Sequence, residues 1–180
     1  MGMRFTTRVL LAVAEWALGL ALVLVLPQTV HHASAATGQD NEKIELYMIA
    51  GDYRRALETC QRGLDETPSV SGYVRLIYVY HAIDAYLEHL SREEQWTAVE
   101  QLYLNLAHRA TEELVDPPGG LARMAKEMIQ TGVRQQSDVA AAMANRLNKT
   151  ETDRLWLEQA RWRDAHPSGW WKSLPSDWMR

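Results

Sequence analysis

Apolar residues recur at three- and four-residue spacing through most of residues 42–165, which is the pattern of amphipathic helices. Residues 71–90 carry apolar side chains on more than one face, so we expect them to form the most buried helix. No stretch alternates with period two for long enough to form a strand. The pattern therefore predicts an all-α fold.

Glycine and proline divide the first part of this pattern into helices. Gly51 separates an expected helix at residues 42–50 from a second one at 53–66, and Pro68 ends the second. The second helix has the clearest apolar stripe, formed by Tyr53, Ala56, Leu57, Cys60 and Leu64.

Polar capping residues predict where the later helices begin. Ser91, with Glu94 three residues later, has the spacing of a capping box, and the helix that it opens is expected to continue to Leu114. Ser137 and Thr150 are expected to cap two further helices. The chain after the prolines at 117 and 118 would then contain three separate helices.

The first 35 residues have the layout of a secretory signal. Basic residues precede an apolar stretch at residues 9–26, and small residues at 33–35 follow it, which is the order of a cleavable signal peptide. The alternative is an uncleaved membrane anchor. In that case Glu15 would lie inside the bilayer, where its insertion costs roughly 2–3 kcal/mol. In both cases we expect residues 36–180 in the periplasm.

Composition excludes several classes of function. The 180 residues have a formal net charge of −4, so no excess of basic side chains is present to bind nucleic acid. Cys60, the single cysteine, cannot form an internal disulfide, and its place on an apolar stripe favours a core residue over a reactive thiol. The sequence contains no Ser-His-Asp set and no Gly-rich phosphate loop, so we expect neither an enzyme nor a bound cofactor.

The segment from Gly51 to Pro68 resembles the second half of a tetratricopeptide (TPR) repeat. Gly51 and Tyr53 fit the turn between the two helices of the family's repeat. Ala56 and Gly63 fit its small-residue positions, and Pro68 fits the proline that closes a unit of about 34 residues.

The resemblance covers one clear repeat at residues 37–70 and a degenerate second one at 71–116. It implies antiparallel helical hairpins stacked into a small right-handed array over residues 36–165, with an irregular helical bundle as the alternative. The sequence departs from the family at three positions where Trp, Leu and Gly are favoured: Asp40, Lys43 and Ile44.

The TPR resemblance also implies a concave groove lined by the first helix of each unit. By position, that groove would contain Asn41 and Glu45 from the first unit and Arg75 from the second. Such a groove holds an extended or helical segment of a protein partner. We therefore expect an exported, non-enzymatic scaffold that binds another protein during assembly or maturation of an envelope or secreted complex.

Tryptophan is concentrated near the C-terminus, where residues 156–180 contain five of the seven. Trp156 and Trp162 are expected to pack on the last helix, and residues 166–180 form a tail in which prolines prevent a continued helix. The tail contains Trp170, Trp171 and Trp178. Exposed tryptophans suggest a surface that binds a partner. The alternative is that the tail folds back to cover the end of the helical stack.

A second function remains open, in which the chain is a small periplasmic metal- or ligand-binding helical bundle. His81, Asp84 and Glu88 share one face of the long helix. The next helix could present Glu100, His108 and Glu112 to them. Histidine and carboxylate ligands from facing helices are typical of such sites, although the paired Glu-x-x-His spacing is absent. The same residues fit an ordinary solvated helix face. An enzyme that uses an isolated glutamate on a wall polymer is the third alternative.

Overall fold

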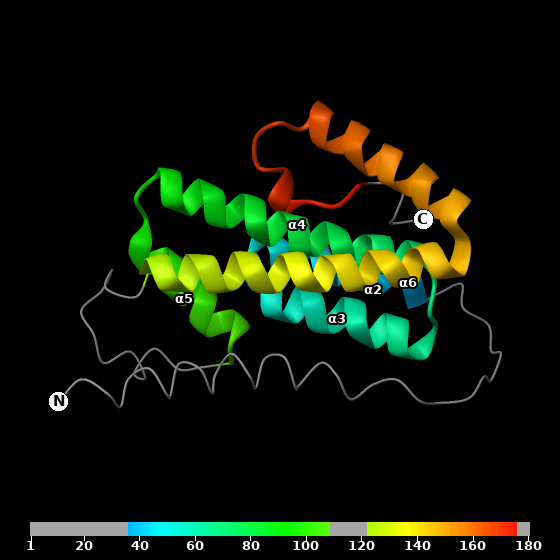
Figure 1. Cartoon of the computed structure of the whole chain (residues 1–180), viewed down its shortest axis with the longest axis horizontal. Coiled ribbons are helices and arrows are strands. Elements are labelled where there is room, and N and C mark those ends of the chain that lie inside the picture. The colour runs from blue at the N-terminus through cyan, green and yellow to red at the C-terminus, as the bar shows by residue number, and fades with distance from the viewer. Residues whose placement is uncertain (1–35, 109–121, 176–180) are drawn as a thin grey trace. The chain divides into compact units, whose positions relative to one another are not determined.

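The computed structural model describes residues 36–108 and 122–175. These residues form five α-helices and one short 3₁₀ helix, without any strand, which confirms the all-α prediction (Figure 1). The elements are α2 (Ala36–Ile49), α3 (Tyr53–Glu66), α4 (Val70–Arg92), α5 (Trp96–Leu106), α6 (Ala122–Ala165) and η2 (Trp170–Lys172). None of the described helices is both long and apolar enough to cross a bilayer. The segment predicted to be a signal, residues 1–35, lies outside the described residues.

Helices α2 and α3 pack together as a hairpin around Gly51. Gly51 has a φ of 74°, in the left-handed region that favours glycine, and the Asp52 carboxylate caps α3 by accepting from the amide of Arg55 at 3.3 Å. Helix α3 has the bounds that its stripe predicts. Helix α2 begins at Ala36, earlier than predicted, because its apolar residues are confined to its second half and gave no signal for its start.

Gly51 lies in the turn before α3 and Gly63 lies inside α3. We expect alanine substitutions at these two positions to have opposite effects on stability. Gly51→Ala should lower the free energy of unfolding by about 1–2 kcal/mol, because an L-residue is strained at positive φ. Gly63→Ala should raise it by up to about 1 kcal/mol, because Gly63 lies inside α3 and an added Cβ would meet no atom within 4 Å. Urea denaturation of both variants measures the difference. Two changes of the same sign would contradict the assigned turn.

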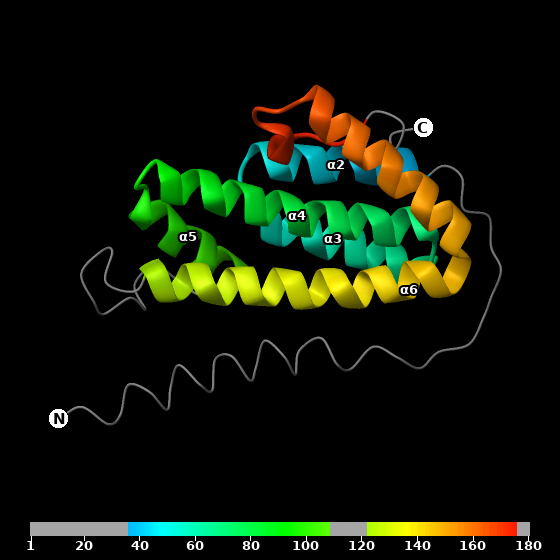
Figure 2. The same ribbon diagram turned by 45° about the horizontal axis from the view of Figure 1, so that its top comes forward.

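Helix α4 is the centre of the helical packing. Its N-terminus is capped by Ser69, whose hydroxyl oxygen accepts from the amide of Gly72 at 3.1 Å, and it contacts α3, α5, α6 and η2 (Figure 2). Seven of its residues are 0% exposed: Val74, Ile77, Tyr78, Val79, Ala82, Ile83 and Leu87. The expectation that this would be the most buried helix is therefore confirmed.

The predicted capping box at Ser91 is wrong. Ser91 lies inside α4, where its hydroxyl donates to the carbonyl of Leu87 at 2.9 Å, and Glu94 lies in the following turn at a φ of 54°. A serine can bond to the carbonyl four residues before it, so it need not end a helix whose apolar stripe continues. Helix α5 begins at Trp96 and ends at Leu106 rather than at Leu114. Residues 109–121 lie outside the described part of the chain.

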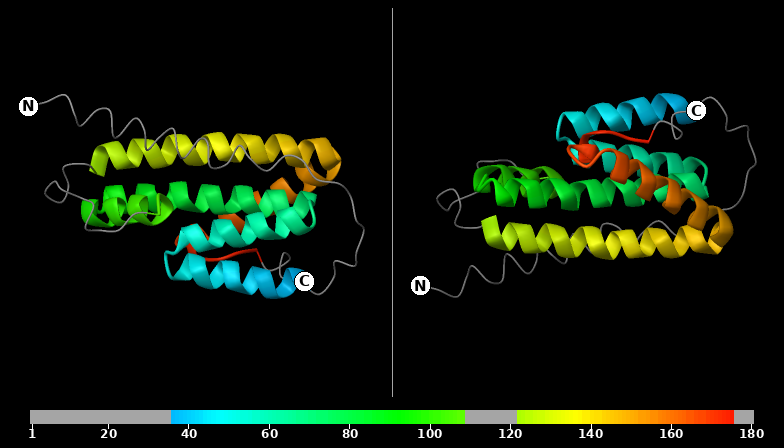
Figure 3. Two further views of the ribbon diagram at one scale, coloured as in Figure 1. Left: turned by 90° about the horizontal axis from the view of Figure 1, so that it is seen from below. Right: turned by 90° about the horizontal axis from the view of Figure 1, so that it is seen from above.

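The last part of the chain was predicted as three helices, but α6 is one stretch with a single break at Asn148 (φ −162°, ψ 102°). Ser137 is buried inside the first half of α6 and caps nothing. After the break, the Asn148 side chain accepts from the amide of Glu151 at 3.2 Å, so Asn148 and not Thr150 caps the second half. Figure 3 shows the first half of α6 beside α4 and the second half returning at an angle.

Candidate functional site

The C-terminal segment, which we define as residues 166–175, lies against α2 and α4 (Figure 1). Two tyrosines bond to its main chain. The hydroxyl of Tyr78 donates to the carbonyl oxygen of Trp170 at 3.2 Å, and that of Tyr53 donates to the carbonyl oxygen of Trp171 at 2.9 Å. The helices therefore bind two successive carbonyl groups of the short 3₁₀ helix η2.

Side chains of the C-terminal segment add contacts of three kinds. The ring of Trp170 meets that of Tyr78 edge-on, with 5.3 Å between centroids, and the Trp171 ring lies 5.3 Å from the ring of His89. The hydroxyl of Ser173 donates to Oε1 of Glu45 on α2 at 2.7 Å. Lastly, Leu174 is only 1% exposed, so this side chain anchors the end of the segment.

The hydroxyl groups of Tyr53 and Tyr78 stay protonated and can therefore donate hydrogen bonds. Burial raises the pKa of Tyr53 well above its usual range, and the neighbouring Tyr86 and Tyr78 raise it further. Burial also raises the pKa of Tyr78, although Trp162 and Arg163 act in the opposite direction. Because both phenols keep their protons at any physiological pH, both can donate to a carbonyl oxygen.

Glu45 on α2, Tyr78 and His89 on α4, and Tyr53 at the start of α3 form one surface. We call this surface the α2–α4 face. It brings together residues that the sequence pointed to for two separate reasons. Glu45 was expected to line a groove, and Trp170 and Trp171 were expected to bind a partner or fold back; in the structure they meet on this face. Trp178, the third tryptophan of the predicted tail, lies outside the described residues.

Asn41 does not lie where the groove prediction placed it. It is 0% exposed, and neither amide atom of its side chain has a hydrogen-bond partner among the described residues. The reason is its position on α2, where it shares the buried face with Ile44 and Met48, three and seven residues later. Asn41 is therefore a core residue.

Arg75 is also largely withdrawn from solvent. Its Nε is buried without a hydrogen-bond partner in the described part of the chain, and burial lowers the pKa of its guanidinium group, while Cys60 and Asp40 act to raise it. Cys60 is buried, and this burial raises the pKa of its thiol to about 12, so it remains protonated and unreactive at neutral pH. The prediction that Cys60 is a core residue is confirmed.

Trp162 and Trp156, the two tryptophans that were expected to pack on the last helix, have different surroundings. Trp162 stacks on the ring of His166, with 3.7 Å between centroids. Trp156 is 40% exposed, so the expectation that it packs inside is wrong. On α6, Leu155 faces the core, and the adjacent Trp156 consequently points outward.

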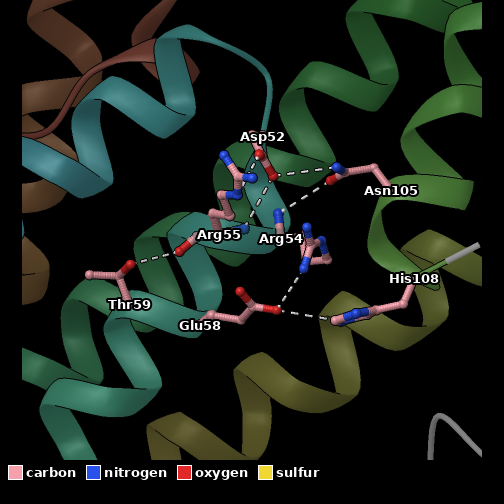
Figure 4. A network of polar contacts seen from close by, with 7 residues as sticks. All are labelled: Asp52, Arg54, Arg55, Glu58, Thr59, Asn105 and His108. Carbon is pink, nitrogen blue, oxygen red and sulfur yellow. Dashed lines mark hydrogen bonds and ion pairs between the residues drawn. The ribbon is translucent and has the colours of Figure 1, made fainter.

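A polar network joins the start of α3 to the end of α5 (Figure 4). Nδ2 of Asn105 donates to Oδ1 of Asp52 at 3.3 Å, while Oδ1 of Asn105 accepts from the amide of Arg54 at 3.4 Å. Glu58 contacts Arg54 at 3.0 Å and His108 at 3.5 Å. These groups are partly exposed and pair with one another, so the network serves to fix the two helix ends.

His81, Asp84 and Glu88, the residues of the alternative metal site on α4, contact side chains of α6. Nε2 of Gln130 donates to Oδ1 of Asp84 at 3.4 Å and to Oε1 of Glu88 at 2.6 Å, and Lys126 contacts Glu88 at 3.1 Å. Nε2 of His81 lies 3.3 Å from the hydroxyl of Ser137. Within residues 36–108 and 122–175, no three His, Cys, Asp or Glu side chains are grouped so that they could hold a metal ion. Of the second set, Glu100 is buried, His108 contacts Glu58, and Glu112 lies outside the described residues.

We expect the folded protein to lose stability in mild acid because of His81. Burial and the nearby Arg163 lower its pKa below 6.5, outweighing Asp84 and Asp138, which act to raise it. Below pH 6.5 the unfolded chain therefore takes up a proton that the folded chain resists, and the free energy of unfolding falls as the pH falls, by at most about 1.4 kcal/mol per pH unit from this group. Well above pH 6.5 the histidine is neutral in both states and contributes no slope.

The His81→Gln variant provides the comparison for this pH effect. It keeps a side chain that can bond to Ser137, but it cannot titrate. Urea unfolding between pH 5 and 7 should show a shallower pH dependence in the variant than in the wild type. Equal slopes would mean that His81 takes up its proton as easily in the folded chain as in the unfolded one.

Comparisons of this chain with models of known protein families, with curated proteins and with solved structures give no match. The function is consequently inferred from the geometry of the α2–α4 face and from the sequence.

Two residues of this face, Tyr53 and Tyr78, were not predicted to have a functional role. Both lie on apolar stripes and resemble ordinary core residues in the sequence. The available signal was the hydroxyl group, because a buried tyrosine, unlike phenylalanine, needs a hydrogen-bond partner.

Proposed function

We propose that this protein is an exported, non-enzymatic helical scaffold that binds a segment of another protein on its α2–α4 face. The observation that carries the proposal is the bonding of Tyr53 and Tyr78 to successive main-chain carbonyls of a short segment with one 3₁₀ turn, η2. Main-chain hydrogen bonds give affinity for a bound peptide segment, and adjacent side-chain contacts give selectivity. Both are present here, because Ser173 of the same segment donates to Glu45 and the next residue, Leu174, is buried.

We further propose that α2–α3 and α4–α5 are two TPR-like hairpins. Supporting features are the turn at Gly51 with its positive φ and the successive packing of α2 on α3, α3 on α4, and α4 on α5. The first helices of these two units, α2 and α4, contact the C-terminal segment, together with Tyr53 at the start of α3. Helix α6, with 44 residues and one break, then closes the array against α4.

Export is proposed from the signal-like layout of residues 1–35. The mass of the protein isolated from its own cells tests it. Cleavage near residue 35 together with recovery in the periplasmic fraction is the expected result. A full-length protein recovered only with cytoplasmic proteins would contradict export.

Photo-crosslinking in living cells tests the binding function. A photoreactive amino acid at His89, on the α2–α4 face, should give one dominant adduct with another protein. The matched control carries the same group at Arg134, which is exposed on α6 and lies outside the face. If both positions give the same adducts, or neither gives any, the α2–α4 face does not bind a partner.

A further inference from the structure

We propose that the C-terminal segment occupies the place of the partner, and that a partner segment of the same chemistry displaces it. That chemistry is a short segment able to form a 3₁₀ turn, with two adjacent aromatic residues, a hydroxyl residue two positions later, and then leucine, as in residues 170–174 of this chain. This inference rests on the proposed function and specifies the partner of the same α2–α4 face.

The two tyrosine contacts on the face do not depend on which chain supplies the peptide. Tyr53 and Tyr78 donate to main-chain carbonyl oxygens, a group that every peptide presents. Trp170 lies 92 positions after Tyr78 in the sequence, so the C-terminal segment itself joins the face only through tertiary packing. A segment from another protein that adopts the same 3₁₀ turn could therefore form the same two bonds.

Side-chain contacts define which peptides fit. The Glu45 carboxylate accepts from the Ser173 hydroxyl at 2.7 Å, which requires a donor two positions after the aromatic pair. The almost complete burial of Leu174 requires an apolar side chain at the next position. The edge-on contact of Trp170 with Tyr78 requires an aromatic ring at the start.

Two features make the C-terminal segment displaceable. It joins α6 through a short connection in which Gly169 has a φ of 75°, so a change at few residues can move it as a unit. It is also an imperfect ligand, because Nε1 of Trp171 is buried with no hydrogen-bond partner in the described part of the chain. A partner that offers an acceptor to this position would bind better than the segment does.

The test uses a fluorescent peptide with the sequence of residues 168–175 and the full-length chain. In an open variant, Trp170→Ala with Trp171→Ala, the face is freed from its own segment. We expect the peptide to bind this variant at least tenfold more tightly than the wild type, as measured by fluorescence anisotropy. Adding Tyr53→Phe and Tyr78→Phe should weaken binding at least fivefold, whereas Tyr103→Phe on α5 should leave it unchanged.

Circular dichroism first establishes that each variant is folded, and Leu174→Ala serves as a second open variant if the double tryptophan variant is not. Absence of peptide binding to a folded open variant overturns the inference. Binding that is unaffected by loss of the two phenols also overturns it. A wild-type dimer with exchanged C-terminal segments would make a second copy of the chain the occupant and likewise overturn the assignment to a different partner.

Failure of this inference can be told apart from failure of the proposed function. If the peptide binds the open variant but crosslinking at His89 yields no adduct in cells, the scaffold function is wrong. If the peptide does not bind while the His89 adduct forms, the face binds a partner of different chemistry and only the inference is wrong.

Discussion

Leu174→Ala should release the C-terminal segment from the helices. The side chain is 1% exposed, and truncation of a buried leucine costs about 2–4 kcal/mol through lost contacts and the cavity that remains. The two tyrosine bonds and the Ser173–Glu45 bond are not altered directly by this change. Because the segment joins α6 through the turn at Gly169, we expect the loss to appear first as local opening.

Amide hydrogen exchange measures this opening. In Leu174→Ala, protection should fall across the amides of residues 169–174 while the amides of α4 retain theirs. Lys172→Ala is the control, because Lys172 belongs to the same segment but is exposed, and it should change little. Unchanged protection in Leu174→Ala would show that this leucine does not anchor the segment.

Asn41→Leu should raise the free energy of unfolding by about 1–3 kcal/mol. Asn41 is 0% exposed, and both amide atoms of its side chain lack a partner among the described residues. An unsatisfied buried polar group costs about that amount, and leucine has a similar size without the polar atoms. The neighbouring buried side chains, Ile44 and Met48, are apolar and compatible with leucine.

Thermal and urea unfolding of Asn41→Leu test this prediction, with Asn145→Leu as the matched control. Asn145 is exposed on α6, so the same substitution there should alter stability by no more than about 0.5 kcal/mol. A loss of more than 1 kcal/mol in Asn41→Leu would mean that the Asn41 amide is hydrogen-bonded in solution. The assignment of Asn41 as a poorly satisfied core residue would then be wrong.

Sequence patterns predicted the elements whose limits are set by local chemistry. The bounds of α3 followed from Gly51, from its apolar stripe and from Pro68, each of which acts within a few residues. Serine was a poor guide to boundaries, because its hydroxyl can cap a helix or bond within one. Ser69 does the first at α4, and Ser91 does the second in the same helix.

The site was only partly predictable because its residues meet across long stretches of sequence. Glu45 and Ser173 are 128 positions apart, and no local pattern links them. The concentration of tryptophan was visible, but the surface that it contacts depends on how α6 breaks at Asn148 and returns. The groove positions carried over from the TPR resemblance placed Asn41 wrongly, because the family pattern does not specify how deeply this α2 is buried.

The most direct test of the account is the yield of the partner adduct from a photoreactive group at His89, compared between the wild type and Leu174→Ala in living cells. If a partner displaces the C-terminal segment, the two compete for the α2–α4 face. We therefore expect a yield several-fold higher in Leu174→Ala, with the adduct still absent from the Arg134 control. An equal or lower yield in the folded variant would contradict the account.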